Sequence, residues 1–220
     1  MATRQLLADL VALYERAGRG QVSIESVGGV DAARRVRGGE AFDFVVLASP
    51  AIGLLADAGL VSADSIVDVA RSEVAVAVKA GAPRPDISDE SALRQAVLAA
   101  RAIGYSTGPS GDHLMRLLER WGIAGELASR LVQAPAGVPV AALLAQGAVE
   151  LGFQQLSELI GIDGVDVLGT LPPGADFVTT FSAARHSGTG QLAAVSDFLE
   201  FLQSDACREA KIRRGMAPAA

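Results

Sequence analysis

The chain has 220 residues, half of them hydrophobic, so it can bury a sizeable core as one large domain or as two lobes. Its formal net charge of −6 argues against a general surface for nucleic acids or anionic membranes, because few positive charges could replace counterions. A single cysteine excludes an internal disulfide, and two distant histidines argue against a metal site. We therefore expect neither a metal nor a cofactor.

Helical and strand patterns alternate along the chain. In chain order we predict a helix at 6–13, a strand at 21–27, a helix at 31–37, a strand at 42–47, a helix at 52–58, a strand at 74–78, a helix at 90–99, a strand at 102–105, a helix ending near 121, a strand at 130–133, a helix at 139–146, strands at 148–153, 165–171 and 177–184, and helices at 191–201 and 204–213.

This alternation predicts an α/β fold of mainly parallel sheets flanked by helices. Segments rich in proline and glycine at 81–85 and 171–174 are interpreted as two crossings between lobes. The first lobe would then be discontinuous, with residues 1–80 and 175–220, and the second would contain residues 81–174. Two crossings imply a ligand cleft between the two lobes.

The stretch at 103–118, IGYSTGPSGDHLMRLL, is typical of a strand, a tight loop and a helix. The amides of Ser110, Gly111 and Asp112 would then lie at a helix start, which can bind an anion. The loop matches neither the G-x-x-x-x-G-K-[ST] nor the G-x-G-x-x-G pattern, so nucleotide binding has no support. The alternative is a turn that only changes the direction of the chain. We expect Gly111→Asp to abolish anion binding with little loss of fold.

Several segments carry a family resemblance in their order and spacing. They are the amphipathic start, SVGGV at 26–30, FDFVVLAS at 42–49, ADAGLV at 56–61, GPSG at 108–111 and the ending FLEFLQSDACREAKIRRGMAPA at 198–219. Together they resemble the molybdate-binding-protein-like branch of the type II periplasmic solute-binding proteins, a branch that also includes aconitate isomerases. The resemblance implies two α/β lobes whose loop amides and hydroxyls hold a small anion, either an oxyanion or a small carboxylate.

Carried over position by position, the resemblance implies ligand-binding residues in both lobes. These are Thr3, Gly28, Gly29, Val30, Ala48, Ser49, Thr107, Ser110, Gly111, Gly137, Val138 and Gln154. Molybdate binders usually have hydroxyl residues where this chain has Gly29 and Val30, and a tyrosine where it has Gln154. The family also usually opens with a strand and a serine-rich loop before the first helix, and this sequence starts at or after that loop.

Three function classes follow from these observations. The favoured one is a non-enzymatic binding protein for an ABC-type transporter; the others are an aconitate-isomerase-like enzyme and a cytoplasmic sensor domain. An isomerase would move a proton on a small tricarboxylate, and His113 is the candidate acid or base near the anion loop. The helix dipole should keep its imidazole neutral. Alternatively, His113 points along a solvated helix face.

Partners and location depend on the same resemblance. We expect a small anionic ligand, an ABC permease as a candidate partner, no nucleic acid and a monomer. No apolar run reaches the roughly 18 residues of a membrane span, and the start MATRQLLADL lacks the apolar core of a secretory signal. The expected location is periplasmic if a signal segment was removed, and otherwise cytoplasmic.

Overall fold

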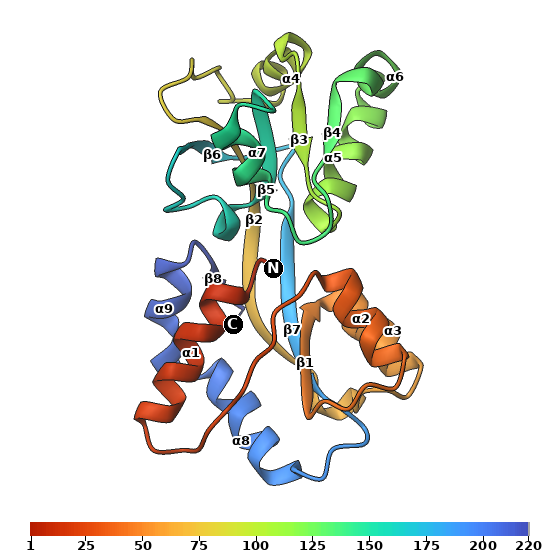
Figure 1. Ribbon diagram of the computed structural model, residues 1–220, viewed down its shortest axis with the longest axis vertical. Helices are drawn as coiled ribbons and strands as arrows, with labels where there is room; N and C mark the ends of the chain where they lie inside the picture. Colours follow the sequence, from red (N-terminus) through yellow and green to blue (C-terminus); the bar gives the residue numbers. More distant parts are fainter. Residues whose placement is uncertain (220) are drawn as a thin grey trace. The chain divides into compact units, whose positions relative to one another are not determined.

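The computed structural model describes residues 1–219, and the chain forms two compact units (Figure 1). Unit 1 consists of Met1–Ser72 and Thr180–Ala220, and unit 2 of Glu73–Thr179. The chain passes from one unit to the other inside two strands, β2 (Val67–Lys79) and β7 (Val178–Arg185). The expected crossings at 81–85 and 171–174 lie within unit 2.

Unit 1 is built from helices around a small antiparallel sheet. Besides its parts of β2 and β7, it contains α1 (Arg4–Arg16), α2 (Gly29–Arg37), β1 (Phe44–Ala48), α3 (Ser49–Asp57), η1 (Ala63–Ser65), α8 (Leu192–Gln203), η4 (Asp205–Cys207), α9 (Arg208–Arg213) and β8 (Ala217–Pro218). Strand β1 pairs antiparallel with β7, and β8 pairs antiparallel with β2. Helices α2 and α3 pack beside each other and against β1 (Figure 1).

The main core of unit 1 joins the two ends of the chain. The apolar stripe of α1, with Leu6, Leu10 and Tyr14, is buried against Phe198 and other residues of α8. The rings of Tyr14 and Phe198 meet edge to face, with their centroids 5.0 Å apart. The helical spacing of the apolar residues in α1 therefore reflects packing against a segment from the far end of the sequence.

Unit 2 surrounds a mixed sheet. Its further elements are α4 (Glu90–Ala99), β3 (Ile103–Tyr105), α5 (Pro109–Arg120), α6 (Ala124–Leu127), η2 (Ala128–Arg130), β4 (Leu131–Gln133), α7 (Val140–Gln146), β5 (Leu151–Gln155), η3 (Leu156–Glu158) and β6 (Val165–Thr170). Strand β3 pairs parallel with β4 and β5, whereas β2 pairs antiparallel with β5 and β6. Alternate residues of β2 enter different cores, Val76 one and Ala75 the other.

Most of the predicted elements are confirmed, and the α/β class is confirmed with them. The sheets are mixed rather than mainly parallel, because β1 and β2 run antiparallel to the strands beside them. The predicted strand at 21–27 is wrong, since the segment forms no strand. Its β-rich residues alternate with exposed Ser23 and Glu25. Glu25 forms an ion pair with Arg35 of α2, and no strand pairs with this segment.

Candidate functional site

The start of α2 presents unused backbone donors in unit 1. Gly28 is the N-cap in an extended conformation, and its carbonyl accepts from the amide of Ala32 at 2.9 Å. Within residues 1–219, the amides of Gly29, Val30 and Asp31 have no hydrogen-bond acceptor. The Asp31 carboxylate accepts from Arg34 at 3.1 Å. Free amides at the positive end of a nine-residue helix are a favourable place for an anion.

Arg35 binds and stabilises the segment that leads into α2. Its guanidinium donates to both carboxylate oxygens of Glu25, at 2.7 and 2.8 Å, and to Glu40 at 2.7 Å. Its central carbon lies 5.2 Å from the ring centre of Phe42. The hydrogen bond from Arg35 lowers the pKa of Glu25 and also that of Glu40. Arg35 is therefore engaged within the protein.

The start of α3 offers backbone rather than side-chain donors. Ala48 is the N-cap and Pro50, the second helical residue, has no N–H. The Ser182 hydroxyl donates to Asp68 at 2.6 Å, and the Ser49 hydroxyl lies 2.5 Å from Ser182 Oγ and 3.1 Å from the Thr180 carbonyl oxygen. Because Ser182 gives its only hydrogen to Asp68, Ser49 must donate to one of its own two partners. Ser49 can thus offer an anion only its amide.

Thr3, the other expected residue of unit 1, lies at the N-cap of α1. It is buried, and its side chain makes no capping hydrogen bond. Its carbonyl accepts from the amide of Leu7 at 2.8 Å, which begins the helix.

Gly111, in the first turn of α5 in unit 2, is a packing residue. A Cβ atom at this position would lie 1.8 Å from the carbonyl oxygen of Ser106 and 2.9 Å from its carbonyl carbon. The Gly111 amide already donates to the Gly108 carbonyl at 2.9 Å. The expectation that Gly111→Asp would leave the fold nearly intact is wrong, because the overlap is with backbone that cannot move away cheaply.

The loop before α5 and the first turn of α5 retain a small number of hydroxyl donors. The hydroxyls of Ser106 and Ser110 lie 2.9 Å apart, and Ser106 Oγ accepts from the Gly108 amide at 3.3 Å. The pair has two hydroxyl hydrogens and uses one between them, so one remains. Thr107 is exposed, whereas Ser110 is buried. Ser106 was not predicted as a hydroxyl donor of this loop, although its place three residues before Pro109 is a local signal for a serine that bonds to the start of a helix.

His113, on α5, is held by contacts with Ala175 and Phe177. Its Nε2 lies 2.8 Å from the carbonyl oxygen of Ala175, and this acceptor fixes the hydrogen on Nε2. The imidazole stacks on Phe177, with ring centroids 4.5 Å apart and planes inclined by 10°. Burial lowers the pKa of His113, and nearby Arg116 lowers it further. The lowered pKa favours the neutral imidazole, with burial as the main cause, and the contacts with Ala175 and Phe177 contradict the solvated-face alternative.

Gln154 caps a helix. Its buried side-chain oxygen accepts from the amide of Val140, the first residue of α7, at 2.8 Å. Residues 135–138 form a turn in which the Val138 amide donates to the Pro135 carbonyl at 2.9 Å. Gly137 occupies the third position of this turn with a φ of +80°, which favours glycine. The amides of Val138 and Val140 at the start of α7 therefore already have acceptors within the protein.

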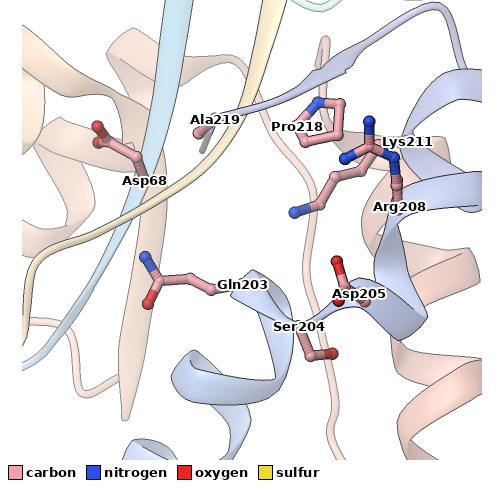
Figure 2. Close-up of a pocket in the computed structure, with 8 residues that line it drawn as sticks. All are labelled: Asp68, Gln203, Ser204, Asp205, Arg208, Lys211, Pro218 and Ala219. Carbon is pink, nitrogen blue, oxygen red and sulfur yellow. The ribbon is translucent and has the colours of Figure 1, made fainter.

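A small pocket in unit 1 contains none of the expected ligand residues (Figure 2). It has a volume of about 30 Å³ and is lined by Asp68, Gln203, Ser204, Asp205, Arg208, Lys211, Pro218 and Ala219. Figure 2 shows the Lys211 side chain reaching from α9 toward the space between α8 and β8. Its ammonium donates to the Leu202 carbonyl at 2.7 Å, and burial lowers its pKa. This space suits one or two water molecules, and Lys211 stabilises the end of α8.

Within residues 1–219, no group of three or more His, Cys, Asp or Glu side chains could hold a metal ion. None of the helices in this range has the length and apolar character needed to cross a membrane.

Comparisons with known proteins agree with this architecture. Aconitate isomerase of a Pseudomonas species is 36% identical over 185 residues, which cover 84% of this chain and 70% of that protein. The periplasmic molybdate-binding protein of Azotobacter vinelandii has a TM-score of 0.81 and 19% identity, covering 98% of this chain and 95% of that one. For the sulfate-binding protein SubI of Mycobacterium tuberculosis the values are 0.79 and 18%, with 98% and 83% covered. These two likenesses show the fold.

The profile of a whole family matches almost the entire chain. The match covers residues 1–217, which includes both units and every expected ligand residue. The chain therefore belongs to the family described as bacterial extracellular solute-binding protein.

Proposed function

We propose that this chain is a solute-binding protein that binds a small anion through backbone amides and hydroxyl groups. The observation that carries the proposal is the start of α2, where the amides of Gly29, Val30 and Asp31 have no acceptor among the described residues. Three adjacent donors at the positive end of a helix favour a negative ligand without the need for a lysine or arginine. The Asp31 carboxylate is turned to Arg34 and leaves the three amides open.

Proteins of the same fold support the choice of an anion. Their descriptions name molybdate for the Azotobacter protein, sulfate for SubI and tungstate for TupA of Desulfovibrio alaskensis. As a solute-binding protein the chain would act as a monomer in the periplasm and deliver its ligand to an ABC permease. The expected clamping of that ligand by two lobes stays a prediction.

The test is the variant Gly29→Asp, examined by isothermal titration calorimetry with molybdate, sulfate, citrate and succinate. A Cβ at Gly29 meets only Leu47, at an ordinary 3.7 Å, so the fold should persist. The new carboxylate would lie at the open amides and repel an anion, so affinity should fall at least about a hundredfold, as for the loss of a charged partner. Unchanged affinity would contradict the assignment of α2.

The matched control is Gly190→Asp. It makes the same substitution in the same unit, at an exposed position with no heavy atom within 4 Å of the added Cβ. Its affinity should equal that of the wild type. An equal loss in both variants would mean that net charge, rather than the start of α2, determines binding.

A second candidate function is isomerisation of a small tricarboxylate, favoured by the 36% identity to aconitate isomerase. The hydrogen bond from Nε2 to Ala175 leaves Nδ1 as the nitrogen of His113 for acid or base chemistry, and the stacking on Phe177 holds the ring. Incubation with cis-aconitate, followed by proton NMR, distinguishes the two functions. Appearance of trans-aconitate that is lost in His113→Phe would identify an isomerase; no conversion supports the binding protein.

A further inference from the structure

We propose that the small pocket in unit 1 binds one chloride ion, or another monatomic anion, as the counter-ion of the buried Lys211 ammonium group. The pocket lies where α8, η4, α9, β2 and β8 meet, and none of the expected ligand residues lines it (Figure 2). The site is therefore separate from the function proposed above, and either proposal can fail without the other.

The ammonium group of Lys211 has no negative partner among residues 1–219. Lys211 is one of two lysines in the chain and is 3% exposed. None of the ion pairs in the described part of the chain includes it. Buried charges in proteins are normally paired, because a charge that leaves water without a partner costs much free energy. The group therefore needs either to release its proton or to bind an anion.

The same ammonium group has unused hydrogens. It has three, and one is donated to the Leu202 carbonyl at 2.7 Å. No second acceptor among the described residues bonds to it. Figure 2 shows the nitrogen at the end of the Lys211 side chain pointing into the pocket, between Gln203 and Asp205. Two hydrogens and a positive charge are thus directed at the same small space.

The carboxylates of unit 1 around this pocket do not neutralise the charge. Asp68, in the lining of the pocket, accepts from the Ser182 hydroxyl at 2.6 Å. Asp9 lies on α1, which packs against α9, and accepts from the guanidinium of Arg214 at 2.7 and 3.0 Å. Asp205 is exposed to solvent and, within residues 1–219, takes part in no ion pair. Each of these groups is therefore held by another partner or hydrated.

The thiol of Cys207 does not supply the negative charge either. It lies one turn before Lys211, and its Sγ donates to the Phe201 carbonyl at 3.1 Å. Burial raises the pKa of Cys207, so the sulfur stays protonated and neutral. The counter-ion of a charged Lys211 must therefore come from solution.

The size of the pocket selects the kind of anion. Its volume is about 30 Å³, which is room for one or two water molecules. A monatomic anion fits this room, whereas sulfate and organic acids carry several further atoms. Water offers an acceptor but no charge. The amide of Gln203 and the guanidinium of Arg208 also line the pocket, and both carry N–H groups that an anion can accept from.

Lysine-selective ¹³C labelling at Cε tests the site in the wild type, because the NMR spectrum then has only two signals, from Lys79 and Lys211. The pH is titrated in sodium chloride and in sodium gluconate at equal ionic strength, with the exposed Lys79 as the reference for general salt effects. Burial lowers the pKa of Lys211, and an anion that binds only the charged form raises it again. We expect the pKa of Lys211 to be higher by about one in chloride at about ten times its dissociation constant. The same pKa in both salts would overturn the proposal.

The variant Lys211→Met tests the same site through stability, since methionine keeps an unbranched apolar chain and removes the charge. The melting temperature of the wild type should be about 3 °C higher in chloride than in gluconate, once chloride is several times above its dissociation constant. This difference should vanish in Lys211→Met and persist in the control Lys79→Met, which removes the other lysine at an exposed position. An equal difference in all three proteins, or an equal rise with sulfate, would contradict a chloride site at Lys211. If Lys211→Met does not fold, the titration of the wild type decides.

Discussion

Similar glycine–valine sequences lie at the starts of α2 and α7, but their backbone amides differ in hydrogen bonding. At α2, the amides after Gly28 have no acceptor among the described residues. At α7, the Val140 amide is bound by the side chain of Gln154, and the Val138 amide closes a turn. The first helix start keeps three adjacent amides open, whereas at the second the amides of Val138 and Val140 are bound by the protein's own groups.

This difference shows why a glycine-rich loop is weak evidence for an anion site. Both loops allow close approach to the backbone, but only unused donors can bind a ligand. Helix α7 also has seven residues, so it contributes a weaker dipole than a longer helix.

The largest effect is expected for Gly111→Ala. Its Cβ would overlap the carbonyl oxygen of Ser106 at 1.8 Å, so the loop and α5 must separate. The free energy of unfolding should fall by about 4 kcal/mol or more, the range of severe packing defects. Urea denaturation followed by circular dichroism measures it. In Gly125→Ala, a helical position of the same unit with open space around it, stability should stay the same or rise slightly.

A smaller effect is expected for Gln154→Leu. The substitution leaves the Val140 amide without its acceptor, at a cost of about 1–3 kcal/mol in unfolding free energy. Anion affinity should change little, because the capping oxygen faces α7 rather than a ligand. The exposed Gln133 provides the control Gln133→Leu. A variant of normal stability that had lost anion affinity would show that Gln154 contacts the ligand instead.

The smallest effect concerns His113 and pH. Its pKa is lowered in the folded protein, mainly by burial, while the unfolded chain has a value of about 6.5. Between these values the unfolded state binds a proton that the folded state does not, so acidification favours unfolding. The stabilising contribution is complete above about pH 6.5 and is lost as the pH falls through the folded value.

Urea denaturation at several pH values, for the wild type and His113→Phe, measures this contribution. Phenylalanine can keep the stacking on Phe177 but does not titrate. The wild type should lose stability relative to the variant as the pH falls below 6.5, the ordinary value for histidine. Parallel curves from pH 8 to pH 5 would mean that His113 is equally easy to protonate in both states.

Local patterns were sufficient for much of the fold. The run FDFVVL predicted β1, and the apolar spacing of α1 and the Gly28-Gly29 pair before α2 were confirmed. The β-rich run at 21–27 was misleading because strand formation needs a partner, and Arg35 binds Glu25 from the neighbouring helix instead. Sequence spacing alone gave no information about such a partner.

The state of the donors could not be predicted, because their acceptors lie far away in the sequence. Ser182 and Asp68, which determine what Ser49 can offer, are 114 residues apart. The side chain of Gln154 can bind the Val140 amide only because β5, which follows α7 in the chain, runs back beside the start of α7. Family resemblance indicated which loops carry candidate donors, whereas hydrogen-bond partners distinguish open donors from used ones.

The composition of unit 1 from both ends of the chain has a consequence for protein synthesis. The hydroxyl of Tyr14 donates to Asp197, a residue 183 positions later. At a translation rate of about 5–20 residues per second, α1 waits on the order of 10 s or more for α8 to emerge. Unit 2 is continuous and can be complete earlier, so the apolar stripe of α1 is the part of the nascent chain most exposed to aggregation and to chaperones.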